Sequence, residues 1–200
     1  MTQTIWIARH GNRIDFVRPE WFNTALRPYD PHLSDDGEIQ AGELANRLKG
    51  ESIDHIFCSP FLRTVQTANP IAEVLDLPLK LEWGLCEWLN PEWMHAMPET
   101  LPLEALKERF PRIDSSYRSR VQPQYPETDE ICWQRTGETA RQLVADFSSN
   151  LLLVGHSASV VGSALGLLGH YAEIQAPLCC LVKLVRREFE WIVELDGSGN

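Results

Sequence analysis

The sequence predicts an α/β fold, a three-layer α/β/α sandwich around a mostly parallel central sheet. Apolar runs typical of strands lie at Ile5–Ala8, Ile53–Cys58 and Leu151–Val154. Amphipathic helical patterns lie between these runs, and this alternation indicates helices packed on both faces of one sheet. Polar residues directly follow the runs, at the strand ends beyond which ligands bind in such folds.

The first long helix is expected from about Asp35 to Lys49. Ser34 is a suitable N-cap because its hydroxyl accepts a backbone N–H, and the acidic first turn suits the positive end of the helix dipole. Gly50 is expected to end the helix. The apolar residues of this helix follow helical spacing: Ala41, Leu44, Ala45 and Leu48.

A second helix is expected after Ser59-Pro60, with a short strand at Leu79–Leu81 beyond it. Leu62, Val65 and Ala68 lie at helical spacing on one face of this helix. Pro70 removes a backbone donor and is expected to kink or restart the helix.

Two segments interrupt this alternation. Residues 12–32 contain three prolines and are expected to form a long loop or short helices. Residues 88–132 mix Pro, Trp, Met and charged residues, and are expected to form an inserted cap over the sheet end, with a helical fragment near 102–110. The acidic run Glu127–Glu130 is expected to be a solvated loop. Both segments should form the rim of a substrate site, as variable loops often do.

Regular structure is expected again in the C-terminal part of the chain. Thr136 is expected to cap a helix, and small residues predict a further helix over Ser157–Leu168. Leu178–Val185 and Glu188–Glu194 predict a final hairpin that turns at Arg186-Arg187.

The composition suits one domain over residues 1–200 and argues against several classes of protein. A hydrophobic content of 44% supports a packed core. The formal net charge of −10 argues against a nucleic-acid partner, which usually requires a basic surface. The sequence has no visible leader or membrane-spanning stretch and no C-x-x-C pair, so we expect no membrane partner and a cytoplasmic location. It does not indicate an oligomeric state.

Four short segments carry the functional prediction. Arg9-His10-Gly11 follows the first apolar run, and Arg63 lies in Ser-Pro-Phe-Leu-Arg-Thr. Glu87 lies in Gly-Leu-Cys-Glu-Trp, and His156 lies in Leu-Val-Gly-His-Ser. Each segment alone is a weak signal. Together, two arginines, two histidines and one carboxylate near strand ends indicate a site that handles phosphate.

The arginines and the first histidine suit the attack on a phosphoryl group. The planar guanidinium pairs bidentately with phosphate oxygens, so Arg9 and Arg63 are expected to bind them, with Arg13 as a third donor. A neutral imidazole attacks phosphorus directly, which makes His10 the expected nucleophile. A turn carbonyl near Gly11 is expected to accept from its other ring nitrogen and so fix the tautomer.

His156 and Glu87 are expected to serve the later stages of the reaction. His156 would donate to the same phosphate oxygens and stabilise the transition state. Glu87 would protonate the leaving oxygen and then accept a proton from the water that attacks the phosphohistidine. Nearby arginines oppose the protonation of Glu87 and a bound phosphate dianion favours it, so we hypothesise a pH optimum below neutral.

The segments resemble the histidine phosphatase superfamily, whose fold is phosphoglycerate-mutase-like. Within it the chain is similar to Sts/TULA-type tyrosine phosphatase domains and ecdysteroid-phosphate phosphatases, through Arg13, Asp54–Pro60 and Glu87-Trp88. Asn12 departs from the Glu or Gln that commonly follows the glycine. The resemblance implies no metal, no cofactor and these site residues: nucleophile His10, proton donor Glu87, and a phosphate pocket of Arg9, Arg13, Arg63 and His156. The matching segments are Ala8–Gly11, Leu33–Ala41, Cys58–Ala68, Gly84–Trp88 and Val154–His156.

We therefore expect a metal-independent phosphomonoesterase that acts through a phosphohistidine on a small-molecule or phosphotyrosine-type phosphoester. A phosphoglycerate mutase-type phosphotransferase shares the first chemical step and stays an alternative. A low-turnover phosphate-binding module is the other, although the presence of both His10 and Glu87 counts against it. One set of side chains suits either an apolar wall for an aromatic leaving group or a small core of the insert: Trp83, Trp88, Trp93, Met94, Met97 and Phe110.

An esterase is the weaker enzyme hypothesis. Gly155-His156-Ser157 imitates the nucleophile elbow of α/β-hydrolases, which also follows a buried strand. That fold needs an acid and then a histidine after the serine. His170 is the only downstream histidine, and residues 158–169 contain no Asp or Glu. The triad cannot be completed in its usual order.

Overall fold

Six strands form one mixed sheet within residues 2–199, the part of the chain that this computed structural model describes. The strand order is β3-β2-β4-β1-β5-β6. The first four strands of that order are parallel, and the last two add an antiparallel hairpin at one edge. The predicted mostly parallel sheet is confirmed. The strands are β1 (Thr4–Arg9), β2 (His55–Cys58), β3 (Leu79–Leu81), β4 (Leu151–Gly155), β5 (Leu181–Arg187) and β6 (Glu190–Asp196).

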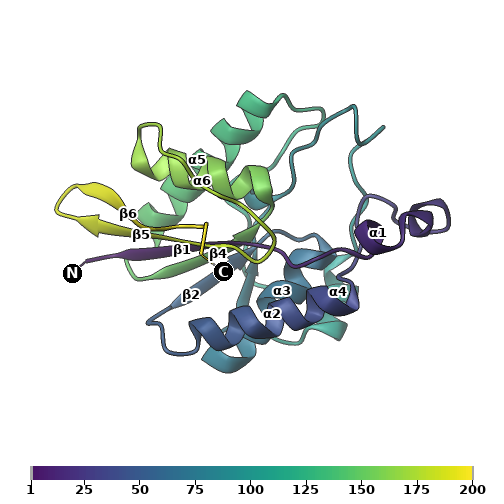
Figure 1. Cartoon of the computed structure of the whole chain (residues 1–200), viewed down its shortest axis with the longest axis horizontal. Coiled ribbons are helices and arrows are strands. Elements are labelled where there is room, and N and C mark those ends of the chain that lie inside the picture. The colour runs from purple at the N-terminus through teal and green to yellow at the C-terminus, as the bar shows by residue number, and fades with distance from the viewer. Residues whose placement is uncertain (1, 200) are drawn as a thin grey trace.

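Helices cover both faces of this sheet (Figure 1), which confirms the three-layer architecture. Helices α5 (Asp129–Asp146) and α6 (Ser157–Leu168) pack on one face, and α2 (Asp35–Leu48) and α3 (Leu62–Leu75) on the other. Side chains alternate along β1, as strand geometry requires. Ile5 and Ile7 join the core under α5 and α6, whereas Trp6 and Ala8 join the core under α2 and α3.

Two helices begin where the sequence predicts. Helix α2 begins at Asp35, and the Ser34 hydroxyl accepts the Gly37 N–H at 3.3 Å. Helix α6 has the predicted bounds, and Gly169 caps its C-terminus with a φ of 73°, in the left-handed region that glycine adopts without strain.

The predicted start of the helix before β4 is wrong. Thr136 is not its cap, because α5 begins at Asp129 and the Thr128 side chain accepts the Ile131 N–H at 3.2 Å. Thr136 lies inside the helix, where its hydroxyl donates to the Cys132 carbonyl at 3.0 Å. Threonine hydroxyls bond to the backbone at helix ends and in helix interiors alike, so the residue type did not distinguish the two positions.

The expectation of a solvated acidic loop at Glu127–Glu130 is also wrong. Asp129 and Glu130 form the acidic first turn of α5, where the helix dipole favours them. Glu127, just before the helix, is buried with 3% of its surface exposed. A buried carboxylate requires a partner, and its partner contributes to the site described below.

The expected restart of the helix at Pro70 is wrong, and so is the expected position of the C-terminal hairpin turn. Helix α3 continues through Pro70 to Leu75, because its buried apolar face compensates for the missing backbone donor. Arg186 and Arg187 are not the hairpin turn but the end of β5. The turn lies at Glu188, which has a positive φ of 56°.

The segment 88–132 forms a cap only in part. Its helix α4 (Leu103–Arg109) packs against the core instead, and Ile113 lies at the outer edge of the sheet. Leu106 and Ile113 belong to the same buried core as α3, and Ile113 forms a parallel bridge with Leu79. Apolar side chains in an irregular segment therefore pack against the nearest open sheet edge.

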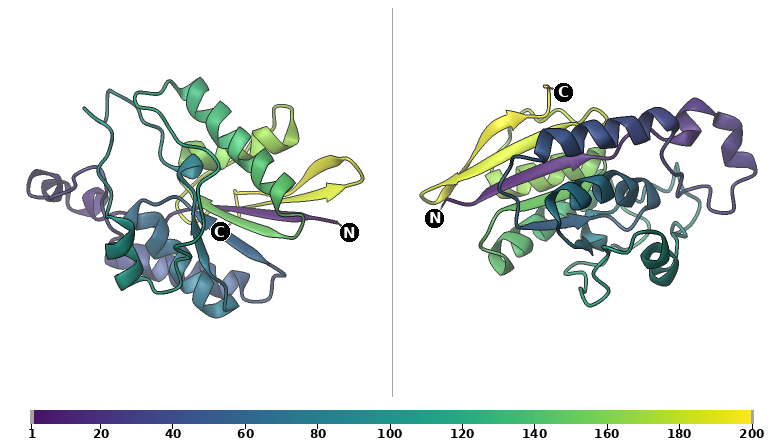
Figure 2. Two further views of the ribbon diagram at one scale, coloured as in Figure 1. Left: turned by 180° about the vertical axis from the view of Figure 1, so that it is seen from behind. Right: turned by 90° about the horizontal axis from the view of Figure 1, so that it is seen from below.

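The segment 12–32 was expected to form a long loop or short helices, and it forms short helices. Helix α1 (Ile14–Val17) and the 3-10 helix η1 (Pro19–Asn23) project beyond the carboxyl end of β1 (Figure 2). Across residues 2–199, no helix has the length and apolar character that crossing a membrane requires.

Candidate active site

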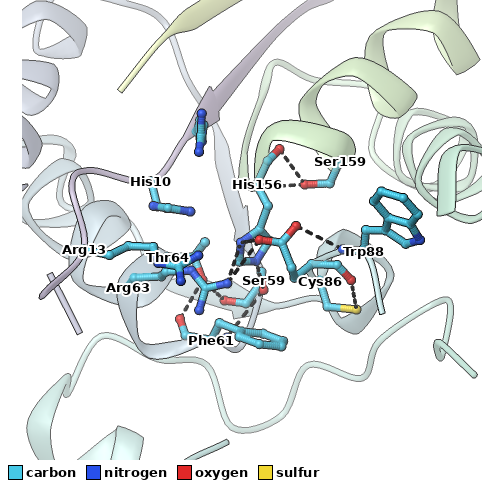
Figure 3. Close-up of polar contacts among 12 residues, drawn as sticks. His10, Arg13, Ser59, Phe61, Arg63, Thr64, Cys86, Trp88, His156 and Ser159 are labelled. Carbon is cyan, nitrogen blue, oxygen red and sulfur yellow. Dashed lines mark hydrogen bonds and ion pairs between the residues drawn. The ribbon is translucent and has the colours of Figure 1, made fainter. Parts of the chain in front are cut away.

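The carboxyl ends of three parallel strands bring the predicted residues together. Arg9 is in register with Gly155 at the ends of β1 and β4, and the His10 N–H donates to the Gly155 carbonyl at 3.0 Å. Ser59 follows β2, and its N–H donates to the Val154 carbonyl at 3.0 Å. The two histidines therefore face each other, with the His10 and His156 ring centroids 5.2 Å apart (Figure 3).

His10 is held in the tautomer that a nucleophile needs. Its Nδ1 lies 2.7 Å from the Gly11 carbonyl, which confirms the predicted acceptor. A carbonyl only accepts, so Nδ1 carries the proton and Nε2 presents its lone pair. Burial, reinforced by the Arg63 charge, holds the pKa of His10 well below 6.5. The imidazole is therefore neutral, and its buried Nε2 has no hydrogen-bond partner within residues 2–199.

Arg63 presents a buried guanidinium to the same space. Its side chain is 1% exposed, and its Nη2 lies 3.3 Å from Oε2 of Glu87. Asp30 lies 4.0 Å from its Nη1 and also accepts the Leu62 N–H at 2.7 Å, at the start of α3. Burial lowers the pKa of Arg63 to about 10, so the group stays charged at neutral pH. Its Nε and Nη1 atoms lack hydrogen-bond partners in the described part of the chain.

The guanidinium groups of Arg9 and Arg13 differ in how many of their donors already have partners. Nη1 of Arg9 donates to the Ala176 carbonyl at 2.8 Å, while its buried Nε has no partner among the described residues. Arg13 forms an ion pair with Asp15 through its Nε and Nη2 atoms. Its guanidinium lies 4.3 Å from the centroid of the Phe16 ring and lines the cavity. Arg13 is thus at the site but already paired with an acid.

Ser59 sets the orientation of His156. The Ser59 hydroxyl lies 2.9 Å from Nε2 of His156 and accepts the Phe61 N–H at 3.4 Å. Nδ1 of His156 faces the Glu87 carboxylate, which only accepts, so Nδ1 carries the proton and Nε2 accepts the Ser59 O–H. Nδ1 lies 3.3 Å from Oε2 of Glu87. His156 is therefore neutral, with its Nδ1–H directed at Glu87, and its donation to phosphate oxygens stays a prediction.

Glu87 accepts several hydrogen bonds at once. Nη2 of Arg63 and Nδ1 of His156 lie 3.2 Å apart, the separation of two donors that share Oε2 as their acceptor. The Trp88 N–H donates to Oε1 at 3.0 Å. Burial raises the pKa of Glu87, but His156 and Arg63 outweigh burial, so the pKa lies well below 4.5. Glu87 is therefore ionised in this state of the site.

The same groups include a set that a metal ion could use. One ligand atom each from His10, Glu87 and His156 lies within 4.8 Å of the others. Nη2 of Arg63 lies within 3.3 Å of both the Glu87 and His156 ligand atoms. A divalent cation between them would meet this buried positive charge at close range, so the site suits an anion better.

A cavity of about 640 Å³ opens from these residues. Of the side chains predicted as either wall or insert core, Trp88, Trp93 and Met94 line this cavity. Phe110 packs against the core under α3, and Trp83 packs against the cluster around Phe61. Trp88 and Trp93 thus belong to the wall and Phe110 and Trp83 to the core, whereas Met94 belongs to both, because it also lies in the buried cluster with Phe61. Phe16, Phe22, Tyr29 and Trp133 add further aromatic surface to the wall.

Sequence reasoning missed four residues that support the site. Ser59 and Asp30 contact His156 and Arg63, and Arg135 forms a buried ion pair with Glu127. Ser59 lay inside a matching segment, which was a usable signal. The other three are single charged residues in segments that resemble ordinary surface, and no pattern marks a charge as buried.

Comparisons with known proteins identify the family of this chain. The family model for the histidine phosphatase superfamily (branch 1) matches residues 5–197. The transcription factor tau 55 kDa subunit of Saccharomyces cerevisiae is 31% identical over 100% of this chain and 52% of its own length. This chain therefore spans about half of that relative. A probable phosphoglycerate mutase, GpmB, from Photorhabdus laumondii is 32% identical over 97% of this chain and 92% of its own.

A solved structure supports the fold. The ecdysone phosphate phosphatase from Bombyx mori, in complex with tungstate, superposes with a TM-score of 0.80 and 23% identity. The match covers 96% of this chain and 92% of that chain. The predicted phosphoglycerate-mutase-like architecture is thus confirmed, and with a family model that matches nearly its whole length, the chain belongs to the histidine phosphatase superfamily.

Proposed function

We propose that this protein is a phosphomonoesterase in which His10 forms a phosphohistidine intermediate. One observation carries the proposal: Nε2 of His10, Nε of Arg9 and Nε and Nη1 of Arg63 are buried without hydrogen-bond partners among residues 2–199. Buried polar groups cost free energy unless they are satisfied. A phosphoryl group would accept from the guanidinium donors and place its phosphorus opposite the lone pair of the neutral His10.

The proposed reaction has two steps. Nε2 of His10 attacks phosphorus, the bond from phosphorus to the ester oxygen breaks, and Glu87 gives its proton to that oxygen. Water then attacks the phosphohistidine, Glu87 takes a proton from this water, and inorganic phosphate leaves with His10 restored. Arg9, Arg63 and His156 would stabilise the charge on the equatorial oxygens in both steps.

Because Glu87 is ionised in the free site, the proton that the leaving oxygen needs must come from the substrate. Phosphate monoesters lose their second proton with a pKa of about 6, so a substrate monoanion carries the required proton. Once bound, the phosphoryl oxygens compete with Glu87 for Arg63 and His156. This competition weakens the interactions that lower the pKa of Glu87. The proton can then pass to Glu87 and on to the leaving oxygen, which gives an optimum below neutral.

The cavity favours a substrate with a bulky apolar or aromatic alcohol. Apolar and aromatic side chains together form most of its wall, and the Trp88 and Trp93 rings meet edge to face with centroids 4.9 Å apart. Arg9 and Arg63 are assigned to the phosphoryl group, and Arg13 is paired with Asp15. A carboxylate elsewhere on the substrate would therefore compete with Asp15 for Arg13, which counts against a phosphoglycerate-type substrate and its mutase chemistry.

Hydrolysis of para-nitrophenyl phosphate with EDTA present tests the proposal, with wild type compared against His10→Ala. We expect turnover by the wild type, loss of at least about 1000-fold in the variant, and an acid-labile phosphohistidine trapped by rapid quench. Chelator should leave the rate unchanged. A folded wild type that binds tungstate but turns over no phosphoester would instead support a phosphate-binding module. Equal activity of wild type and variant would refute the role of His10.

A further inference from the structure

A buried ion pair lies directly beside the Glu87 segment. The Arg135 side chain is 5% exposed and that of Glu127 is 1% exposed. Nε of Arg135 donates to Oε1 of Glu127 at 2.5 Å, and Nη2 donates to Oε2 at 2.7 Å. The two bonds form the bidentate pairing that fixes the plane of a guanidinium. The predicted chemistry does not use either residue.

Apart from a contact of Nη2 with Sγ of Cys132 at 3.5 Å, the remaining contacts of Arg135 are with the backbone around Glu87. Nη1 donates to the Gly84 carbonyl at 2.8 Å and to the Cys86 carbonyl at 3.2 Å. Nη2 donates to the carbonyl of Glu87 itself at 3.2 Å. One rigid group therefore holds the main chain before the carboxylate residue and at that residue.

Glu127 holds the main chain on the other side of Glu87. Its Oε2 accepts the Leu89 N–H at 3.3 Å, and its own N–H donates to the Leu89 carbonyl at 3.0 Å. Its carbonyl accepts the Trp88 indole N–H at 3.0 Å. The backbone on both sides of Glu87 is thus tied to one ion pair, which α5 anchors.

We propose that Arg135 and Glu127 are positioning residues that set the Glu87 carboxylate at the distance from the leaving oxygen that proton transfer requires. The inference rests on the proposed phosphomonoesterase function. A buried ion pair is by itself weak evidence for stability, because desolvation offsets most of its attraction. The hydrogen bonds of this pair go mainly to the backbone of residues 84–89, which indicates that the pair positions this segment. Displacement of a catalytic group by about 1 Å can cost about 100-fold in rate.

The test compares two substrates that depend differently on the acid. Para-nitrophenolate is a weak base and leaves with little help, whereas 2-phenylethyl phosphate releases a strongly basic alkoxide that needs the proton. We expect Arg135→Lys and Glu127→Gln each to lower kcat for 2-phenylethyl phosphate by about 100-fold. The kcat for para-nitrophenyl phosphate should fall less than about fivefold. KM should change little for both substrates, because neither residue lines the cavity.

Helix α5 supplies matched controls in a second arginine–glutamate pair. Nη2 of Arg141 lies 2.9 Å from Oε2 of Glu138, and both side chains are about half exposed. Arg141→Lys and Glu138→Gln should leave both substrates unaffected. A further control introduces Arg135→Lys into a Glu87→Gln background, where no correctly placed acid is left to disturb. There the ratio of the two rates should not change further.

Parallel losses on both substrates, or an additive loss in the Glu87→Gln background, would overturn the positioning role. The role would also be overturned if folded Arg135→Lys and Glu127→Gln kept the wild-type ratio of kcat values for the two substrates. Glu127→Gln keeps size and shape and carries the test if Arg135→Lys does not fold. An inactive wild type would overturn the proposed function itself, whereas an active wild type with parallel losses overturns only this inference.

Discussion

The backbones of Gly11 and Gly37 are in direct contact. A Cβ atom on Gly11 would lie 2.6 Å from the Gly37 carbonyl oxygen, and one on Gly37 would lie 2.1 Å from the carbonyl oxygen of Asn12. Two hydrogen bonds join the same segments, since the Ser34 N–H donates to the Asn12 carbonyl at 3.0 Å and Oε1 of Gln40 accepts the Asn12 N–H at 2.8 Å. The first turns of α2 therefore hold the turn that carries His10.

This contact predicts that Gly37→Ala is destabilising. The obstructing atom belongs to the backbone, so no flexible side chain can move aside, and overpacking of this kind costs about 1–3 kcal/mol. Thermal unfolding followed by circular dichroism measures the loss. Gly42→Ala on the same helix is the control, since nothing lies within 4 Å of a Cβ there. It should stabilise the protein by about 0.5–1 kcal/mol through helix propensity alone. Changes of the same sign in the two variants would contradict the packing argument.

The residues that come together at the site could be predicted from the sequence more fully than the residues that support them. Arg9 ends β1, and His10 and His156 directly follow β1 and β4. Arg63 lies at the start of the helix after β2, and parallel strands bring their carboxyl ends to one edge of a sheet. The carbonyl that fixes His10 was also predictable, because the turn at Gly11 leaves few other acceptors nearby. Both inferences need only the positions of these residues relative to the predicted strands and turns.

The supporting residues required the tertiary structure. Glu127 and its neighbours form an acidic run that is indistinguishable from a solvated loop until Arg135, a turn or more into α5, is seen to pair with it. Thr136 and Thr128 have the same capping chemistry, and only the packing of α5 selects one. Helix α3 continues through Pro70 for a similar reason, because tertiary burial overrides a local preference.

Ser59→Ala should change the tautomer of His156. The hydroxyl lies 2.9 Å from Nε2, and its loss removes the O–H that pairs with the Nε2 lone pair and so favours the Nδ1–H form. We expect kcat to fall about five- to tenfold, in line with one hydrogen bond of about 1 kcal/mol. Nitrogen NMR of labelled histidine should report a shift of His156 toward the Nε2–H form. Unchanged histidine signals together with an unchanged rate would show that Ser59 does not orient His156.

The buried site predicts that stability falls as the pH is lowered. Burial lowers the pKa of His156 from 6.5 to about 4, so the unfolded chain takes up a proton between these values while the folded chain does not. His10 acts in the same direction. Glu87, whose pKa in the fold lies well below 4.5, loses its stabilising contribution as the pH falls through and below 4.5. Proton uptake by the unfolded chain therefore lowers the free energy of unfolding below pH 6.5.

Scanning calorimetry from pH 7.5 to 4.5 measures this dependence. The Tm should decrease most steeply below pH 6.5, and saturating tungstate should raise it by binding only the folded protein. His156→Gln removes one of the groups and should show a shallower decrease over the same range. An equal slope in wild type and His156→Gln would exclude His156 as a source of the pH dependence.

Trp93→Ala tests the apolar wall of the cavity. The indole is 58% exposed and meets Trp88 edge to face, so its removal should cost little stability but much of the contact with an aromatic leaving group. At about 25 cal/mol for each Å² of apolar surface, a contact of roughly 60 Å² is worth about 1.5 kcal/mol. We therefore expect KM for 1-naphthyl phosphate to rise about tenfold. KM for phosphoserine, which lacks an aromatic group, should change less than about twofold.

Phe189→Ala, on the distant hairpin turn and 89% exposed, is the control for loss of an exposed aromatic residue. Because the proposed phosphoryl contacts are common to both esters, a similar rise in KM for both would place the effect at Arg9 and Arg63 rather than at the wall, and the preference for an apolar alcohol would be wrong.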